Sequence, residues 1–160
     1  MADHVEEKVG SKGAYVLFTA NFTDVKPVGM HVPIPDIPIK AKILDVKTRP
    51  NQTTAGTWVT SMEVEVVEPA QYAGARRYTK NMRHVDASEA GQNMRRSWRT
   101  ALESVGYTPA QLDDGTDATL GTSSFMGKIA HFNHIPAPPG ATELVNGKQV
   151  KKYDDIEFIT

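Results

Sequence analysis

The stretch Trp58–Glu68 constrains the fold most, because apolar and polar residues alternate along it. One side of an extended chain takes Trp58, Thr60, Met62, Val64 and Val66, and the other takes Ser61, Glu63 and Glu65. A period of two residues is typical of a strand with one buried face, whereas a helix would scatter the same residues around its axis. The sequence therefore predicts a sheet with one face on a core.

Two further strands are predicted before this one. Tyr15–Phe22 is rich in aromatic and apolar residues and is expected to form a first strand, with Phe18 packed in the core. Ile37–Thr48 is expected to form a second. Its core face would consist of Ile39, Ala41, Ile43 and Asp45. The prolines between the two strands exclude a helix, so Val25–Asp36 is expected to be an extended loop. Asn51–Gly56 has the composition of a turn that joins paired strands.

The end of the chain carries more strand signals. Phe125–Phe132 is mostly apolar and is expected to form a fourth strand. Asn146-Gly147 predicts a tight hairpin, because both residues tolerate the positive φ of a type I′ turn. A last strand is expected to end near Phe158.

One longer helix is predicted between these two groups of strands. Asp86 is expected to cap it, with Glu89 completing a capping box, and Gly106 supplies the left-handed residue that ends it. Its apolar stripe consists of Met94, Trp98, Ala101, Leu102 and Val105. The segment before it, Tyr72–Tyr78, is expected to bend at Gly74.

This order of elements predicts a mainly β protein, a five-stranded OB-fold Greek-key barrel with one helix between the third and fourth strands. Loops alone connect the first strands, which excludes a parallel α/β fold. A different antiparallel sheet packed on one helix is the alternative. A length of 160 residues suits one domain. We place that single domain at residues 14–160, after a flexible N-terminal arm at residues 1–13.

The composition excludes several classes of protein. The chain has no cysteine, which removes disulfides, thiolate zinc sites and cysteine nucleophiles. No apolar run is long enough to cross a bilayer, and the acidic first residues lack the features of a secretory signal. We therefore expect a cytosolic protein without a membrane partner.

Positive charge is concentrated in the stretch Tyr72–Arg99, although the whole chain has a formal net charge of −1. Its cations are Arg76, Arg77, Lys80, Arg83, Arg95, Arg96 and Arg99. Its acids are Asp86 and Glu89, and acids at helical spacing from the arginines are expected to be missing. A solvated charged face is the simpler interpretation. We favour a site for a polyanion, because guanidinium groups suit phosphates and base stacking.

Aromatic residues beside these cations indicate single-stranded nucleic acid. Proteins that bind single strands combine a basic groove with aromatic side chains on which bases stack. Tyr72 and Tyr78 flank the arginines and Gly74, and Trp58 begins its strand beside a turn. The predicted nucleic-acid-binding residues are Tyr72, Arg76, Arg77, Tyr78, Lys80, Arg83, Trp58, Arg95, Arg99 and Lys128.

Catalytic sites are not indicated. On a strand, the spacing of His131 and His134 sends their side chains to opposite faces, so they are not expected to share a metal ion. The sequence has no phosphate-binding loop, dinucleotide fingerprint or nucleophile elbow. Asp113, Asp114 and Asp117 could hold a divalent ion as in a nuclease, but turn roles are favoured for the first two. We therefore expect no enzyme, cofactor or metal.

With its Tyr72-Ala73-Gly74-Ala75-Arg76-Arg77, Val105-Gly106-Tyr107 and Phe125-Met126-Gly127-Lys128 motifs, the chain resembles phage-encoded OB-fold single-stranded DNA-binding proteins. The resemblance spans roughly Tyr15 to Phe158. It implies a non-enzymatic protein that coats single-stranded DNA in phage replication or recombination, in the host cytoplasm. It also implies that Arg76, Arg77 and Lys128 hold the backbone and that Tyr72 is a stacking platform.

The acidic end of the chain leaves two interpretations open. Asp154–Thr160 is similar to the tails by which bacterial single-strand binding proteins recruit replication or recombination partners, but it lacks their terminal Pro-Phe. A last strand of the sheet is therefore favoured. For the whole chain, the alternative function is a virion structural protein or a protein–protein adaptor, and a homo-oligomer is compatible with either function.

Overall fold

The computed structural model describes residues 14–23 and 32–160. The predicted flexible arm at residues 1–13 lies outside the described residues, as does most of the predicted loop Val25–Asp36. No helix in the described part of the chain is long and apolar enough to cross a membrane.

A long antiparallel hairpin of β1 (Pro38–Pro50) and β2 (Trp58–Glu68) forms the centre of the fold. The predicted turn joins the strands, where the Asn51 amide donates to the Thr57 carbonyl (2.8 Å) and Gly56 has a φ of 78°. Met62, Val64 and Val66 are buried, as the alternation of β2 predicted. The bounds of β2 match the prediction.

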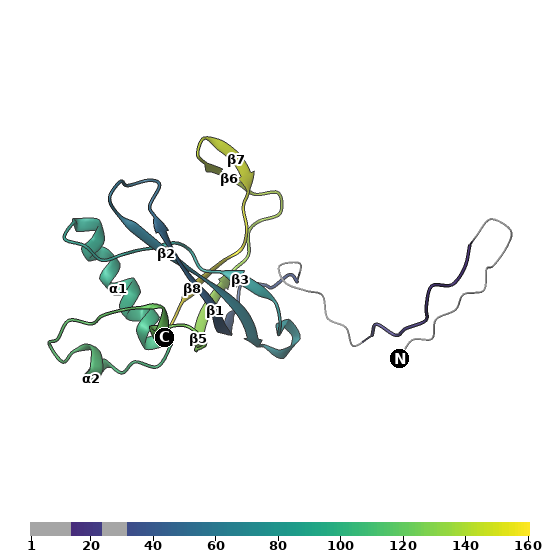
Figure 1. The fold of residues 1–160 in the computed structure, drawn as a ribbon, viewed down its shortest axis with the longest axis horizontal. Coiled ribbons are helices and arrows are strands. Elements are labelled where there is room, and N and C mark those ends of the chain that lie inside the picture. Colours follow the sequence, from purple (N-terminus) through teal and green to yellow (C-terminus); the bar gives the residue numbers. More distant parts are fainter. Residues whose placement is uncertain (1–13, 24–31) are drawn as a thin grey trace.

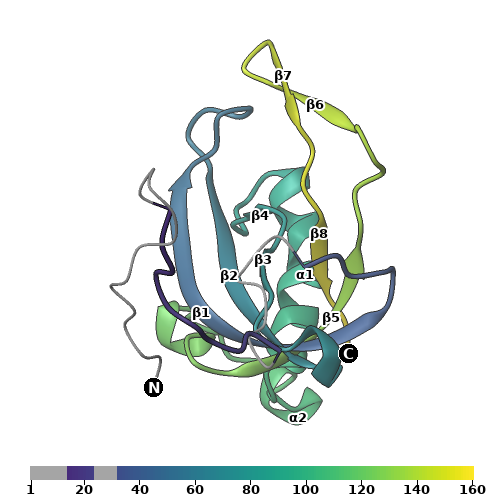
Figure 2. The ribbon, with the colours of Figure 1, turned by 90° about the vertical axis from the view of Figure 1, so that its right-hand side faces the viewer.

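Further strands extend this hairpin on both sides. The strands β3 (Arg76–Tyr78) and β4 (Met82–Arg83) pair with β2, while β5 (Ile129–Ile135) pairs with β1 and β8 (Asp155–Phe158) pairs with β5. The order β3-β2-β1-β5-β8 is antiparallel throughout, and a parallel bridge between Thr79 and Ile156 brings its two edges together. The sheet therefore curls into a half-barrel (Figure 2). The mainly β prediction is confirmed.

Strand β1 bends at two shifts of register, one between Lys40 and Ala41 and one between Ile43 and Asp45. Ile39, Ala41 and Ile43 point into the core, as predicted. The prediction for Asp45 was wrong, because the second shift reverses the alternation. Asp45 consequently pairs with Glu63, and Val46 takes the position opposite the buried Met62.

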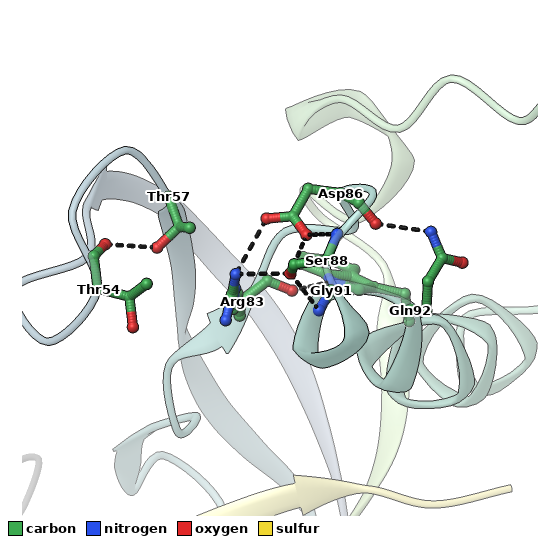
Figure 3. Close-up of polar contacts among 8 residues, drawn as sticks. Thr54, Thr57, Arg83, Asp86, Ser88, Gly91 and Gln92 are labelled. Atoms are coloured by element: carbon green, nitrogen blue, oxygen red, sulfur yellow. Dashed lines mark hydrogen bonds and ion pairs between the residues drawn. The ribbon is translucent and has the colours of Figure 1, made fainter.

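The helix α1 (Glu89–Ser104) begins two residues later than predicted. Ser88 is its N-cap and accepts a hydrogen bond from the Gly91 amide at 3.1 Å. Asp86 accepts bonds from the amide and hydroxyl of Ser88, and one from Arg83 (Figure 3). The hydrogen bonds from Ser88 lower the pKa of Asp86. Asp86 therefore holds the capping residue in place and is not itself the cap.

Three hydrogen bonds join α1 to β4 and β5. The Trp98 indole donates to the Arg83 carbonyl at 2.8 Å, and the Ser104 hydroxyl donates to the His131 carbonyl at 3.0 Å and accepts from the His131 amide at 2.8 Å. The predicted stripe packs inward, with Trp98, Ala101 and Leu102 buried. A chain of ring contacts joins Trp98 to Phe125, Phe125 to Phe158 and Phe158 to Phe132.

Two strand predictions were wrong. Ala14–Thr23 contains no strand, and Phe18 is 54% exposed instead of packed. Strand β5 starts at Ile129, four residues after the predicted start at Phe125. The positive φ of Gly127 (77°) interrupts an extended chain, and Phe125 reaches the core from the turn before it. Short helices fill the remaining connections: η2 (Ala70–Tyr72), α2 (Pro109–Leu112) and η3 (Thr122–Ser124).

The predicted hairpin at Asn146-Gly147 is confirmed, with φ values of 51° and 76°. It joins β6 (Thr142–Val145) to β7 (Lys148–Lys151), which form a separate two-stranded sheet. Every residue of both strands is exposed. This β6–β7 ribbon and the β1–β2 turn project on the same side of the molecule (Figures 1 and 2).

Gly91→Ala is expected to destabilise the protein, although alanine usually favours a helix. A Cβ at this position would lie 1.9 Å from an Asp86 carboxylate oxygen and 2.6 Å from the Asp86 amide nitrogen. Relieving this contact disrupts the start of α1, at a cost of about 1–3 kcal/mol. Urea denaturation measures this loss as a decrease in the free energy of unfolding. Ser97→Ala, on the exposed side of the same helix, is the control, and equal stability of both variants would contradict the contact.

Candidate nucleic-acid interface

The cations of Tyr72–Arg99 are mostly neutralised by acids from other parts of the chain. The shortest ion pairs are Arg76–Glu63 (3.1 Å), Arg77–Asp154 (3.3 Å), Lys80–Glu157 (2.8 Å), Arg83–Asp86 (3.1 Å) and Arg99–Asp113 (2.5 Å). Arg99 also pairs with Glu103, one helical turn further on, at 2.9 Å. The prediction that acids are missing at helical spacing was wrong. Within the described residues, Arg95 and Arg96 are the members of this stretch without an acidic partner.

Arg77 points into the protein, although the sequence predicted a phosphate contact for it. Successive side chains of a strand point to opposite faces, so Arg76 and Tyr78 face outward while Arg77 lies on the row of the buried Val64. Its exposed fraction is 2%. A nucleic-acid strand on the surface cannot reach this guanidinium, and Arg77→Glu would bury an uncompensated charge.

A buried polar cluster holds Arg77 in place. Its Nε donates to His134 Nε2 at 3.0 Å and lies 3.3 Å from Asp154 Oδ2, and its Nη2 donates to the Val32 carbonyl. His134 Nδ1 lies 3.1 Å from the Pro35 carbonyl, which can only accept. The proton of neutral His134 is therefore on Nδ1, which leaves Nε2 free to accept from Arg77. Burial and the Arg77 charge lower the pKa of His134.

The same cluster fixes the root of the β6–β7 ribbon. Asp154 follows the ribbon in the chain, and its Oδ1 accepts from the amide of Ala137, which precedes the ribbon, at 2.8 Å. The Asp154 carboxylate therefore links both ends of the β6–β7 ribbon to Arg77 of β3. We call Arg77, His134 and Asp154 the root cluster.

The stability contributed by the root cluster should depend on pH. Because the pKa of folded His134 lies below its unfolded value of about 6.5, the unfolded chain binds more protons as the pH falls, and folding stability is lost there. His134→Gln removes this dependence. The stability gap between wild type and variant should shrink by about 1 kcal/mol between about pH 7.5 and about pH 5.5. Thermal unfolding measures the gap, with His131→Gln, at an exposed position, as control. A stability difference between wild type and His134→Gln that stays constant with pH would contradict the lowered pKa of His134.

An open groove lies between the sheet and the β6–β7 ribbon, with a volume of about 1490 Å³. We call it the hairpin groove. Its polar and aromatic lining includes Arg49, Ser61, Tyr78, Lys80, Asn81, Glu143, Gln149, Lys151, Lys152 and Tyr153. Asp154 and Asp155 also line it, but Arg77 and Lys80 neutralise them.

Unpaired positive charge and exposed aromatic rings meet in this groove. Arg49, Lys151 and Lys152 have no acidic partner within the described part of the chain, and Glu143 is the one lining acid without a cationic partner there. Arg49 donates to the Asn81 amide oxygen at 3.1 Å. Tyr153 is 58% exposed, and the Lys151 Nζ lies 5.5 Å from the centre of its ring. This arrangement can hold an anionic backbone beside stacked rings.

The structure brings few of the predicted site residues together. Tyr78 and Lys80 line the hairpin groove, and Arg77 lies buried beneath it. The others lie elsewhere. Trp58 is 50% exposed at the start of β2, Tyr72 packs against the core in η2, Arg76 and Arg83 are ion-paired, Lys128 lies over the Tyr107 ring, and Arg95 and Arg99 are on α1.

Sequence reasoning missed Arg49, Asn81, Lys151, Lys152 and Tyr153 as groove residues. A signal for some of them was present. Arg49 precedes the Asn51–Gly56 turn, and the run Lys151-Lys152-Tyr153 follows the Asn146-Gly147 turn. Both turns project on the same side of the molecule, so cations beside them were stronger candidates for one shared site than cations in the middle of strands.

A second groove, of about 1040 Å³, runs between α1 and the loop after α2. Arg95 and Arg96 line it beside the ion-paired Arg99, and Asp117 lines it from the loop. Asp113 pairs with Arg99 of α1. Asp114 is the predicted turn residue, because it accepts from the amide and hydroxyl of Thr116. Side chains of both charges line this groove, so it is a weaker candidate for a polyanion site than the hairpin groove.

The predicted separation of His131 and His134 is confirmed, since the first is exposed and the second is fully buried. The described residues contain no group of three or more histidines and acids placed to hold a metal ion.

Comparison with known proteins gives no relative from which a role can be transferred. No protein-family model matches the chain, and no curated protein matches it. The functional argument therefore rests on the groove itself.

Proposed function

We propose that this chain is an OB-fold protein that binds single-stranded DNA in the hairpin groove without sequence preference. One observation carries the proposal. Unpaired cations from β1 and from the end of the ribbon converge on one groove with exposed rings from β3 and from the end of the ribbon. Arg49, Lys151 and Lys152 would face the phosphates, while Tyr78 and Tyr153 would stack on bases.

The strand order supports the OB-fold part of the proposal. A five-stranded OB barrel pairs its first strand with the second and the fourth, and closes between the third and the last. Here β1 pairs with β2 and β5, and the parallel bridge joins the segment after β3 to β8. The helix α1 lies in the chain between β4 and β5, and the ribbon is inserted between β5 and β8. OB-folds bind oligonucleotides with the face of their second and third strands and with the loops between strands one and two and between strands four and five. In this chain those loops would be the β1–β2 turn and the β6–β7 ribbon, which project on the same side of the molecule.

The biological setting is proposed from the resemblance to phage single-strand binding proteins. A protein of this kind would coat single-stranded DNA during replication or recombination in the host cytoplasm and would not be an enzyme. Asp155 and Glu157 lie in β8 and pair with Lys80. We therefore do not include a partner-recruiting acidic tail in the proposal.

A virion structural or adaptor protein is the second candidate function. Exposed apolar side chains on the ribbon favour it, since Leu144 is 69% exposed and Val145 is 42% exposed. Light scattering that shows a large, salt-insensitive assembly without affinity for DNA would support this candidate over DNA binding.

Lys151→Glu with Lys152→Glu should weaken binding of a fluorescent oligothymidine at least about tenfold in anisotropy titrations, which is about 1.4 kcal/mol. The slope of log affinity against log salt should fall by about 1.4, because each phosphate contact to a single strand contributes about 0.7. Arg95→Glu with Arg96→Glu is the matched control, since it changes the net charge equally and also removes two unpaired cations. Equal losses from both pairs would show that binding is diffuse, and no binding by the folded wild type at low salt would refute the proposal.

Tyr153→Leu should separate stacking from simple charge attraction. Loss of a stacked ring costs about 1–3 kcal/mol in single-strand binding proteins. Affinity for oligothymidine should fall by that amount, while affinity for inorganic polyphosphate, which has no bases, should stay unchanged. Competition titrations measure both affinities. An equal loss for the two polyanions would mean that Tyr153 does not stack.

A further inference from the structure

The second groove, between α1 and the loop after α2, is lined in large part by apolar side chains. We call it the α1 groove. Trp98 and Leu102 line it from the buried stripe of the helix, and Val85 and Leu120 line it with exposed fractions of 46% and 39%. Its volume of about 1040 Å³ is at the upper end of the range of about 300–1,000 Å³ for ligand pockets, so a short peptide segment has room in it.

Two arginines beside these apolar side chains have charge available for a ligand. Arg95 and Arg96 line the α1 groove, are exposed and have no acidic partner within the described residues. Arg95 donates to the side-chain oxygen of Gln92 at 3.4 Å, but this amide is neutral and leaves the positive charge uncompensated. The α1 groove therefore combines aliphatic surface with free positive charge.

The third arginine of the α1 groove holds its two walls together. Arg99 donates to both carboxylate oxygens of Asp113, at 2.5 and 3.1 Å, and to Glu103 at 2.9 Å. A bidentate pair between arginine and carboxylate has a well-defined geometry. It joins the helix to the start of the loop after α2, so the groove is already formed in the free chain.

Nucleic acid is a poor match for the α1 groove. Single-strand sites stack bases on accessible aromatic rings, whereas Trp98, the aromatic residue that lines this groove, is 8% exposed and donates its indole N–H to the Arg83 carbonyl. Asp117 adds a carboxylate without a cationic partner in the described part of the chain, and this charge repels phosphates. Aliphatic surface beside cations instead matches a peptide that carries both apolar and acidic side chains.

We propose that the α1 groove binds a segment of a partner protein in which acidic residues flank a large aliphatic side chain. The carboxylates of that segment pair with Arg95 and Arg96, and its aliphatic side chain packs against Leu102 and Leu120. Grooves that bind peptide segments commonly combine an apolar anchor site with charges that select the partner.

Charge complementarity favours a partner protein over a second copy of this chain. A second copy offers Glu143 beside the exposed Leu144 and Val145 of its ribbon. That segment has one carboxylate for the two guanidinium groups of Arg95 and Arg96. A partner segment with several acids neutralises both.

This inference goes beyond the proposed function and does not depend on it. The α1 groove and the hairpin groove share no lining residue. Figures 1 and 2 show α2 and the β6–β7 ribbon at opposite ends of the molecule. Peptide binding and DNA binding can therefore fail separately, and each has its own measurement.

Fluorescence anisotropy with a synthetic peptide tests the proposal. The probe is a short labelled peptide in which leucines alternate with pairs of aspartates, and the matched peptide has serine in place of each leucine. The wild type should bind the leucine peptide at least about tenfold more tightly, because a leucine side chain is buried in the groove. Equal affinity for the two peptides, or no binding by the folded wild type, would overturn the proposal.

Variants of the chain locate the binding site. Arg95→Glu with Arg96→Glu should lower affinity for the leucine peptide at least about tenfold, since attraction becomes repulsion. Leu120→Ser should weaken binding of the leucine peptide and not of the serine peptide. Lys151→Glu with Lys152→Glu is the matched control, which should weaken oligothymidine binding and leave peptide binding unchanged. Equal loss of peptide affinity in both charge-reversal pairs would overturn the proposal, and circular dichroism confirms that each variant is folded.

Three further measurements identify other occupants of the α1 groove, and the proposal expects a negative result from each. Displacement of the peptide by oligothymidine would make the groove a site for polyanions. Peptide affinity that rises after Asp3→Asn with Glu6→Gln and Glu7→Gln would show that the chain's own first residues occupy it. A dimer in sedimentation velocity that Arg95→Glu with Arg96→Glu dissociates would place a second copy there. Any of these results would overturn the proposal.

Discussion

The buried charge of Arg77 is the interaction on which the arrangement of the groove depends. A guanidinium in the interior must be paired, since an unpaired buried charge costs several kcal/mol. Burial lowers the pKa of Arg77, and the adjacent Asp154 carboxylate opposes that shift. Its partners come from the segment before β1, from β5 and from the end of the ribbon. One side chain therefore joins the edge strand β3 to the segment before β1, to β5 and to the end of the ribbon, and the neighbouring Tyr78 and Asp154 line the hairpin groove.

Ion pairs inside the protein and on its surface determine which cations remain available to a ligand. Asp154 of the root cluster pairs with Arg77 inside the protein. Glu63, Glu157 and Asp113 neutralise other cations of the stretch Tyr72–Arg99. Among the described residues, cations without an acidic partner include Arg95 and Arg96 on α1, and Arg49, Lys151 and Lys152 beside the two turns that project on one side of the molecule. A chain with a net charge of −1 can therefore present a locally positive groove.

Local patterns predicted the elements that depend on local physics. The alternation of Trp58–Glu68, the stripe around Trp98 and the Asn146-Gly147 turn each specify their own geometry, and the structure has all three. The candidate site was harder to predict, because ion pairs join residues far apart in the sequence, such as Arg77 and Asp154. The inward direction of Arg77 was nevertheless available, since neighbours on a strand point to opposite faces. Tyr15–Phe22 was assigned to the sheet by its composition alone, which specifies a strand but not its partner.

Amide chemical-shift mapping with an oligothymidine tests the central claim, that the hairpin groove is the binding surface, most directly. The proposal predicts that the largest perturbations at low salt fall on Arg49, on Tyr78–Asn81 and on Gln149–Tyr153, with small effects along α1. Perturbations concentrated on Arg95–Arg99, or spread evenly over every exposed cation, would contradict it.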